Sequence, residues 1–242
     1  MSRLPNAPLV EVLIELRWKI KSKEDLTKVQ FLYGDIYAEL KNKYPHRETI
    51  IPVEIPIELT INQPAYRFRV EKDKYPLYQV GPGVFTVNTI HEIYDWETFY
   101  AQCDELIEKF LGVYSFKKDE LINPTIQYLD FFPINFNQEN VIDFVNKRFK
   151  VKLEQSFIQN PGLPTDINLA FSFNSKPGNL LVFFQKGRNS KGQEGILLQT
   201  KVTGNGILGE KDLILEWLDN AHNMCSESFK KLTAGELYES FK

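Results

Sequence analysis

The chain has 242 residues, of which 43% are hydrophobic, 25% are charged and 13% are aromatic. This composition is typical of a globular protein, and the length suits either one large domain or two small ones. The formal net charge of −3 excludes a whole-protein field that would attract nucleic acid, although it leaves open a local basic patch.

The first half of the chain combines strand and helix patterns. Residues 10–18 alternate apolar and polar side chains, which indicates a half-buried strand. Apolar residues at helical spacing predict a helix over 26–40, and Asp95 is placed to cap another over 96–110. Between these helices we expect a loop over 46–56 and strands over 57–61, 66–70 and 77–88, the last containing a turn or a bulge at Gly81-Pro82-Gly83.

The second half repeats a similar order of patterns. It predicts a strand over 125–132, a short helix over 140–149, a loop over 150–166 that contains Pro161, and strands over 167–173, 180–185 and 195–202. Asp212 is then expected to cap a long final helix that carries apolar residues as far as Phe229.

The similar order of the two halves predicts an internal duplication. We expect an α+β fold made of two β-α-β-β-β-α repeats, over 1–122 and 123–242, that form antiparallel sheets with helices packed on one face. The repeats are expected to form one continuous domain. The alternative is one irregular antiparallel sheet with helices on one face. The duplicated order resembles the topology of the TATA-box-binding protein, whose open sheet face grips its ligand.

Cysteine use and the lack of long apolar runs indicate a cytoplasmic protein. Cys103 and Cys225 each fall on an apolar helical stripe, which predicts two buried free thiols and no disulfide framework or zinc site. Residues 1–6 lack the apolar core of a signal peptide. No stretch approaches the roughly 18 apolar residues of a membrane span. We therefore expect a cytoplasmic location and no membrane contact.

No segment matches a nucleophile elbow, a P-loop, a zinc-binding HExxH helix or a Rossmann glycine fingerprint, so we expect no cofactor and no metal. Asp219 and His222 are three positions apart on the last helix, where a carboxylate could orient an imidazole for acid–base chemistry. A structural hydrogen-bonded pair is the competing interpretation.

Charged residues gather on the outward side of two predicted strands. Alternation places together Glu11, Glu15 and Arg17 on one strand, and Arg67, Arg69 and Glu71 on the other. If the strands share a sheet, the face away from the helices carries an acid–base ladder. It is either a solvated face with cross-strand ion pairs or a contact surface for a partner chain or polar ligand, with arginines as forks for carboxylate or phosphate.

Two further features could lie on a contact surface. Lys186 and residues 187–192 form a small basic hairpin tip, which reads as a mobile polar turn or as a nucleic-acid contact. Phe131-Phe132 and Phe183-Phe184 are adjacent aromatic pairs in predicted strands, so one ring of each pair must face away from the helices. An exposed ring there would favour an interface or a ligand groove.

Several stretches together resemble a sporadically distributed prokaryotic protein family of unknown function. They are 7–11, 15–18, Tyr44-Pro45, 78–88, 94–97, Asp219 with Ala221-His222, Phe229 and Leu232-Thr233. Where that family shows an Arg-Tyr-Ile-Asn strand after the middle helix, this chain has Gln127-Tyr128-Leu129-Asp130. The resemblance implies a full-length single-family protein of patchy distribution, as accessory or defence-linked genes have, and brings no established activity.

These patterns predict a non-catalytic binding or regulatory protein that uses its open sheet face to self-associate as a homo-oligomer or to hold a protein partner. One alternative is nucleic-acid or nucleotide binding through Arg17, Arg67, Arg69 and the 186–191 turn. The other is an enzyme built around His222 and Asp219.

Overall fold

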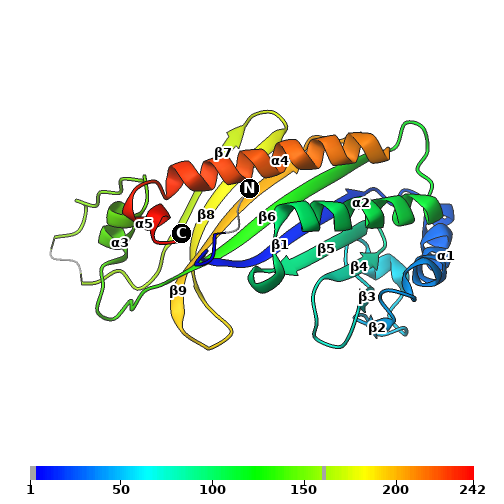
Figure 1. Ribbon diagram of the computed structural model, residues 1–242, viewed down its shortest axis with the longest axis horizontal. Coiled ribbons are helices and arrows are strands. Elements are labelled where there is room, and N and C mark those ends of the chain that lie inside the picture. The colour runs from blue at the N-terminus through cyan, green and yellow to red at the C-terminus, as the bar shows by residue number, and fades with distance from the viewer. Residues whose placement is uncertain (1–3, 160–161) are drawn as a thin grey trace. The chain divides into compact units, whose positions relative to one another are not determined.

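The computed structural model describes residues 4–159 and 162–242 and has the predicted α+β fold. Within these residues, ten strands form one antiparallel sheet and five α-helices accompany it (Figure 1). The strands are β1 (Leu9–Trp18), β2 (His46–Thr49), β3 (Tyr66–Arg69), β4 (Leu77–Gly81), β5 (Val84–Ile90), β6 (Leu121–Pro133), β7 (Asn168–Asn174), β8 (Gly178–Arg188), β9 (Glu194–Gly204) and β10 (Ile207–Leu208). The helices are α1 (Lys23–Leu40), α2 (Trp96–Val113), α3 (Val141–Arg148), α4 (Lys211–Leu232), α5 (Glu236–Glu239) and the short 3-10 helices η1 (Ile57–Thr60) and η2 (His91–Ile93). The strand order is β2-β3-β4-β5-β1-β6-β9-β8-β7, with β10 paired to β6.

The chain divides into two compact units. Unit 1 holds the chain up to Glu11 together with Gln127–Val202 and Ala221–Lys242, and unit 2 holds Val12–Ile126 and Thr203–Asn220. Because β1, β6, β9 and α4 contribute residues to both, neither unit is one continuous stretch of sequence. The repeats over 1–122 and 123–242, and the internal duplication, stay predictions; residues 1–3 of the first repeat and Pro161 of the expected loop lie outside the described residues.

Unit 2 confirms the half-buried strand expected at the start of the chain. In β1, Val12, Ile14, Leu16 and Trp18 are buried, whereas the residues between them are only half-buried. Side chains at alternate positions of a strand point to opposite faces of the sheet. The apolar side of β1 therefore forms part of the core, and Glu15 and Arg17 lie on the other side.

Side chains at the helix starts explain where α1 and α2 begin. The Ser22 hydroxyl accepts a hydrogen bond from the N–H of Asp25 at 3.2 Å, and the Asp25 carboxylate accepts one from the N–H of Ser22 at 3.0 Å. This reciprocal pair satisfies two N–H groups that a helix start leaves without partners. At α2 the Asp95 carboxylate accepts from the N–H of Thr98 at 2.9 Å, which confirms the predicted cap.

Helices α1 and α2 pack on the same face of the sheet. Tyr37 of α1 stacks on Phe68 of β3 with ring centroids 6.1 Å apart, and Phe110 of α2 stacks on Phe85 of β5 at 4.7 Å. Because strand side chains alternate, the neighbours of Phe68 and Phe85 in sequence point to the opposite face. That opposite face carries the charged residues singled out in the sequence.

The turn between β4 and β5 needs both of its glycines. A Cβ atom at Gly81 would overlap the backbone carbonyl of Gln63. Gly83 has a φ of +79°, where L side chains are strained, and a Cβ there would lie 2.7 Å from the carbonyl oxygen of Trp18. The segment before β3 is held close by a hydrogen bond from the Asn62 N–H to the Pro82 carbonyl at 2.7 Å. Of the two predicted possibilities, Gly81-Pro82-Gly83 thus forms the turn, and it divides the expected strand into β4 and β5.

Two predictions between α1 and β3 were wrong. Residues 57–61 were expected to form a strand but contain η1, in which the Thr60 hydroxyl donates to the carbonyl of Ile57 at 2.9 Å. Pro56 directly precedes this helix. Because proline has a fixed φ and no backbone N–H, it favours a helical turn here over a strand paired in a sheet. The expected loop over 46–56 instead begins with β2, which pairs with β3 from His46 opposite Arg69 to Thr49 opposite Tyr66.

Unit 1 has its own core between β6, β8, β9 and the helices α3 and α5. Asn140 caps α3 by accepting from the N–H of Ile142 at 2.9 Å, within the predicted short helix. The core is formed by Phe132, Ile134, Phe136, Val141, Phe144, Val145, Phe149, Val182, Phe184, Ile196, Leu198, Leu237 and Phe241. Phe132 and Phe184 are the buried members of the two aromatic pairs, as strand alternation requires.

The other member of each aromatic pair is half-buried and not exposed. Phe131 lies over Gly195, where a Cβ atom would come within 2.5 Å of its ring. The glycine thus gives the ring a place to pack on the face away from the unit 1 core.

The cap predicted for the last helix was also wrong. Helix α4 begins at Lys211, so Asp212 lies inside its first turn. The N–H of Ile214 already donates to the carbonyl of Glu210 at 3.0 Å, which places the helix start before Asp212. The Lys211 ammonium also lies 2.6 Å from the carboxylate of Asp104 on α2, so an ion pair holds this end of the helix.

Candidate functional site

A polar ladder crosses four strands of unit 2 on the face away from α1 and α2. Glu48 of β2 lies opposite Arg67 of β3, Arg67 lies opposite Gln79 of β4, and Gln79 lies opposite Thr86 of β5. Each of these residues is a sequence neighbour of a side chain that points toward the helices or the core. We use the name polar ladder for His46, Glu48, Arg67, Arg69, Gln79, Thr86 and Asn88.

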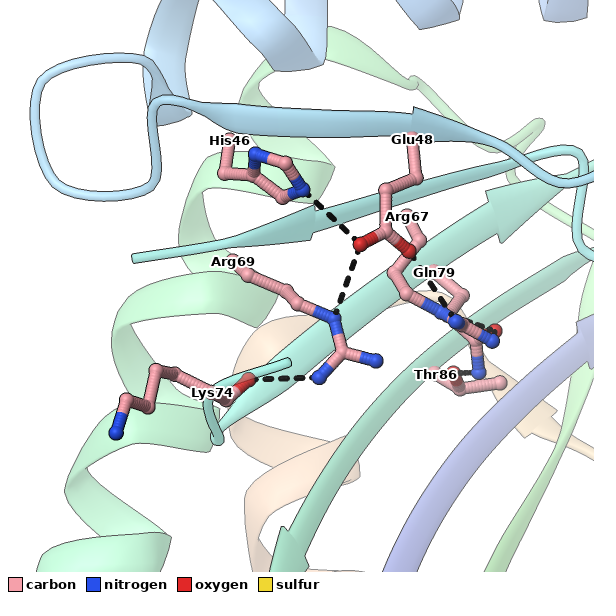
Figure 2. A network of polar contacts seen from close by, with 7 residues as sticks. All are labelled: His46, Glu48, Arg67, Arg69, Lys74, Gln79 and Thr86. Atoms are coloured by element: carbon pink, nitrogen blue, oxygen red, sulfur yellow. Dashed lines mark hydrogen bonds and ion pairs between the residues drawn. The ribbon is translucent and has the colours of Figure 1, made fainter. Parts of the chain in front are cut away.

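The ladder is held together by hydrogen bonds and, at Arg69, by an ion pair to Glu48, and Figure 2 shows most of these contacts. One Arg67 Nη atom donates to Glu48 Oε2 at 3.2 Å and the other donates to Gln79 Oε1, also at 3.2 Å. The Gln79 amide donates to the Thr86 hydroxyl at 3.2 Å, and that hydroxyl donates to Asn88 Oδ1 at 3.1 Å. Each side chain is therefore held in one orientation by its neighbours on the adjacent strands.

Glu48 is the centre of the ladder. Its Oε1 atom lies 3.0 Å from His46 Nε2 and 3.7 Å from Arg69 Nε. Burial raises the pKa of Glu48, but the hydrogen bond from His46 and the charges of Arg69 and Arg67 outweigh it, so the pKa lies below its ordinary value. An ionised carboxylate only accepts, so His46 must carry its proton on Nε2.

Arg69 is built into unit 2 rather than offered to solvent. It is 6% exposed, donates from Nη1 to the Lys74 carbonyl at 2.8 Å, and places its guanidinium 5.3 Å from the centre of the Tyr75 ring. The Nε atom is buried and forms no hydrogen bond to the residues that the structure describes. Arg69 therefore supports Glu48, while Arg67, with 31% of its side chain exposed, reaches the surface.

Arg17 and Glu15 form a second pair on the same face of the sheet. Arg17 Nε lies 2.5 Å from Glu15 Oε1, and Nη2 lies 2.8 Å from Oε2, so the contact is bidentate. The remaining Nη1 donates to the backbone carbonyl of Asn62 at 3.1 Å. Arg17 thus ties β1 to the segment that joins β2 and β3.

That segment follows β2 in the chain and exposes aliphatic side chains. We use the name apolar loop for residues 50–61, which expose Ile50, Val53, Ile55, Leu59 and Ile61 by 39%, 75%, 43%, 71% and 36%. The loop is tied down at both ends: the N–H of Ile50 donates to the Ala65 carbonyl at 2.8 Å, and Asn62 meets Arg17 and Pro82. Exposed apolar side chains on an anchored segment are typical of an interaction site.

The structure brings together only some of the predicted site residues. Arg67 and Arg69 join through Glu48, which the sequence did not single out. Arg17 pairs with Glu15, whereas Glu71 is exposed beyond the end of β3. Glu11 belongs to unit 1, whereas the ladder belongs to unit 2. No pattern in the four residues of β2 distinguishes them from a loop, so the central carboxylate could not be found from sequence.

His222 lies in unit 1, on the buried side of α4. Its Nδ1 atom lies 2.6 Å from the Tyr128 hydroxyl. Burial, followed by the charge of Lys230, lowers the pKa of His222 to about 4, so the ring is neutral near pH 7. Asp219 is exposed and belongs to unit 2, so its predicted pairing with His222 stays a prediction.

Asp130 and Cys225 are also buried in unit 1. Burial raises the pKa of Asp130 to about 8 and that of Cys225 to about 12, and the Asp130 carboxyl adds to the rise at Cys225. Cys103 is buried in unit 2, and both thiols are free, as predicted. The raised pKa values favour the protonated forms of the Asp130 carboxyl and of both thiols near pH 7.

The basic hairpin tip carries its own counter-charge. Glu194 lies 2.8 Å from Arg188 Nη2 and 3.6 Å from Lys186 Nζ. Lys186 Nζ also lies 4.5 Å from the centre of the Phe136 ring. Two of the cations that the nucleic-acid alternative assigns to this turn are thus already paired with a carboxylate.

Across 4–159 and 162–242, no three His, Cys, Asp or Glu side chains lie close enough together to hold a metal ion. In the same part of the chain, no helix combines the length and the apolar character that crossing a membrane requires.

Comparison with known proteins adds no relative from which a role could be carried over. The resemblance to a prokaryotic family and to the TATA-box-binding topology stays a prediction. The chain matches no protein-family model, no curated protein and no solved structure.

Proposed function

We propose that the chain is a non-catalytic binding protein, and that the apolar loop and the polar ladder of unit 2 together form the surface that holds a protein partner. The observation that carries this proposal is the exposure of Val53 by 75% and Leu59 by 71% on a segment whose ends are hydrogen-bonded to the sheet. Side chains of this kind lose contact with water when a second protein covers them, which favours association.

The ladder supplies the polar part of the same surface. Protein interfaces combine an apolar centre with a polar rim, and rigid side chains cost little conformational entropy to immobilise. Arg67 and Glu48 are fixed by their mutual contact and by Gln79 and His46, yet 31% and 27% of their side chains remain exposed. They can therefore contact a partner without first becoming ordered.

The pairing of the arginines favours a protein over a nucleic acid. Arg17 is bidentate to Glu15, and Arg67 is bound to Glu48, so a phosphate would have to compete with carboxylates already in place. Nucleic-acid binding needs unpaired cations that release counterions from phosphates. Aliphatic side chains such as Val53 and Leu59 add nothing to phosphate recognition.

Capture of the partner followed by measured affinities tests the proposal. The wild-type chain is immobilised, the protein that it retains from a cell extract is identified and purified, and its binding is titrated by calorimetry. Val53→Ser with Leu59→Ser should weaken binding at least tenfold, and Arg67→Gln should weaken it severalfold. The matched control is Phe31→Ser, because Phe31 is 68% exposed on α1 and lies outside the loop and ladder.

Two results would contradict the proposal. One is a purified partner that binds the Val53/Leu59 double variant as tightly as it binds the wild type. The other is retention of the wild-type chain on a heparin column that disappears with added salt and with Arg67→Gln, which would favour the nucleic-acid alternative.

A further inference from the structure

Strand β7 forms one end of the sheet and pairs with β8 alone among the strands that the structure describes. An edge strand presents backbone N–H and C=O groups that can pair with another chain. Natural edge strands discourage this by being short or by carrying charges, prolines or bulges. The opposite edge, β2, has only the four residues His46–Thr49, three of which are charged or titratable.

β7 lacks these protective features. Its seven residues, Asn-Leu-Ala-Phe-Ser-Phe-Asn, include no charge, no proline and no glycine. Phe173 is 51% exposed, while Leu169 and Phe171 are half-buried against the unit 1 core. The edge is therefore long, uncharged and partly apolar.

The pairing with β8 shows which backbone groups face outward. The N–H of Lys186 donates to the Ile167 carbonyl at 3.2 Å, and the N–H of Ser175 donates to the Gly178 carbonyl at 3.3 Å. Hydrogen-bonded and non-hydrogen-bonded pairs alternate in an antiparallel ladder, so the odd-numbered residues of β7 bond to β8. The N–H and C=O groups of the even-numbered residues, from Asn168 to Asn174, point to the free edge.

The sequence of β7 is complementary to itself. An antiparallel copy centred on Phe171 places Asn168 opposite Asn174 and Ala170 opposite Ser172, so the even-numbered residues meet as hydrogen-bonded pairs. The same register places Leu169 opposite Phe173 and the two Phe171 rings opposite each other, as non-hydrogen-bonded pairs whose side chains approach most closely. Small residues face small residues, and large apolar residues face large apolar residues.

We propose that two copies of this chain associate through β7, in antiparallel register about Phe171, so that the sheet continues from one copy into the other. A two-fold interface uses the same patch on both copies, which a self-complementary strand provides. Pairing satisfies the outward backbone groups and covers the exposed Phe173. β7 lies in unit 1 and the loop and ladder lie in unit 2, so this proposal and the proposed function can fail separately.

The mass of the chain in solution, measured by sedimentation over a wide concentration range, tests the association. The wild type should shift from the mass of one chain to that of two. Ala170→Pro removes one outward N–H and should raise the dissociation constant at least tenfold, whereas Ala170→Ser keeps that N–H and should leave it unchanged.

A second pair of variants tests the same interface without proline, in case Ala170→Pro does not fold. Phe173→Lys places a charge on the edge and should also weaken association at least tenfold. Phe31→Lys, at an exposed position on α1, should not change it. A chain that stays single at every concentration, or a dimer that survives both Ala170→Pro and Phe173→Lys, would overturn the proposal.

Cross-linking reports the register itself. Non-hydrogen-bonded antiparallel pairs bring Cα atoms to about 4.5 Å, which suits a disulfide. Phe171→Cys should therefore give a disulfide-linked dimer under mild oxidation, while Ala170→Cys should not, because each residue 170 lies opposite residue 172. Efficient linking at 170 with none at 171 would overturn the register.

Discussion

The hydroxyl oxygen of Tyr128 on β6 lies 2.6 Å from Nδ1 of His222 on α4, inside unit 1. The ring is neutral near pH 7 because burial lowers its pKa to about 4, so the pair is a hydrogen bond between uncharged groups. Tyr128→Phe removes the hydroxyl and should lower the free energy of unfolding by about 1–2 kcal/mol, measured by urea denaturation.

The same variant separates the hydrogen bond from the burial. Since burial is the main cause of the lowered pKa, the His222 ring of Tyr128→Phe should still titrate far below 6.5 in NMR spectra. Recovery of an ordinary histidine pKa in a folded variant would show that the tyrosine, and not burial, keeps the ring neutral.

The carboxyl of Asp130 should make stability fall as pH rises. Burial raises its pKa from 3.8 to about 8 in the folded chain, so the folded state holds a proton that the unfolded state has lost. The stabilisation is complete below pH 3.8 and is lost as pH rises toward 8. His222 has the opposite effect on stability. Its pKa is about 4 in the folded chain and ordinarily 6.5, so its contribution is lost as pH falls below 6.5.

Between pH 6.5 and 8 the titration of Asp130 therefore outweighs that of His222. It lowers the free energy of unfolding by about 1.4 kcal/mol per pH unit. Asp130→Asn mimics the neutral carboxyl and should gain about 2 kcal/mol over the wild type across that interval. Urea denaturation of both chains at pH 6.5 and pH 8 measures the gain. Parallel stability curves for the two chains would refute a protonated Asp130.

The approach of Gln63 to the β4–β5 turn leaves no space for a side chain at Gly81. Gly81→Ala would drive a Cβ atom into the Gln63 carbonyl, and we expect a loss of more than about 3 kcal/mol in the free energy of unfolding. Gly34→Ala is the matched control, because Gly34 lies on the exposed side of α1 with no atom near its would-be Cβ.

Gly34→Ala should raise the free energy of unfolding by about 0.5–1 kcal/mol, because alanine restricts the unfolded chain and favours the helix. Thermal unfolding of both variants measures the contrast. Equal stability of Gly81→Ala and the wild type would show that the segment before β3 is not held against the turn.

Strong local periodicity was the part of the fold that sequence could predict. β1 was clear because its alternation runs over the whole strand, and α2 was clear because Asp95 caps a long apolar stripe. β2 was missed because four residues are too few to show a period. It pairs with β3, and His46 lies opposite Arg69, more than twenty positions away along the chain. Such pairing is decided by tertiary contacts, which propensity does not contain.

In the candidate site, too, sequence predicted the local pattern of each strand but not the pairing between strands. Alternation correctly predicted that Arg17 and Arg67 point away from the helices, because period-two geometry needs no knowledge of the neighbouring strand. It could not supply the partner of Arg67, which depends on strand order and register. The contact of His222 with Tyr128 was hidden for the same reason, since the two residues are 94 positions apart.

The central place of Glu48 in the ladder can be tested without knowing any partner. Glu48→Gln removes the charge that faces Arg67 and the buried Arg69, leaving two guanidinium groups close together. We expect a loss of about 1–3 kcal/mol in the free energy of unfolding at pH 7. The matched control is Glu58→Gln in η1, where the side chain is exposed and the expected change is within about 0.5 kcal/mol.

The pH dependence of the same variant identifies the cause. The pKa of Glu48 is lowered in the folded chain, so its stabilisation is present above the ordinary value of 4.5 and is lost as pH falls through the folded pKa. The gap between wild type and Glu48→Gln should therefore narrow under acid conditions in urea denaturation. A gap that is the same at pH 7 and at acid pH would mean that shape, and not charge, gives Glu48 its role.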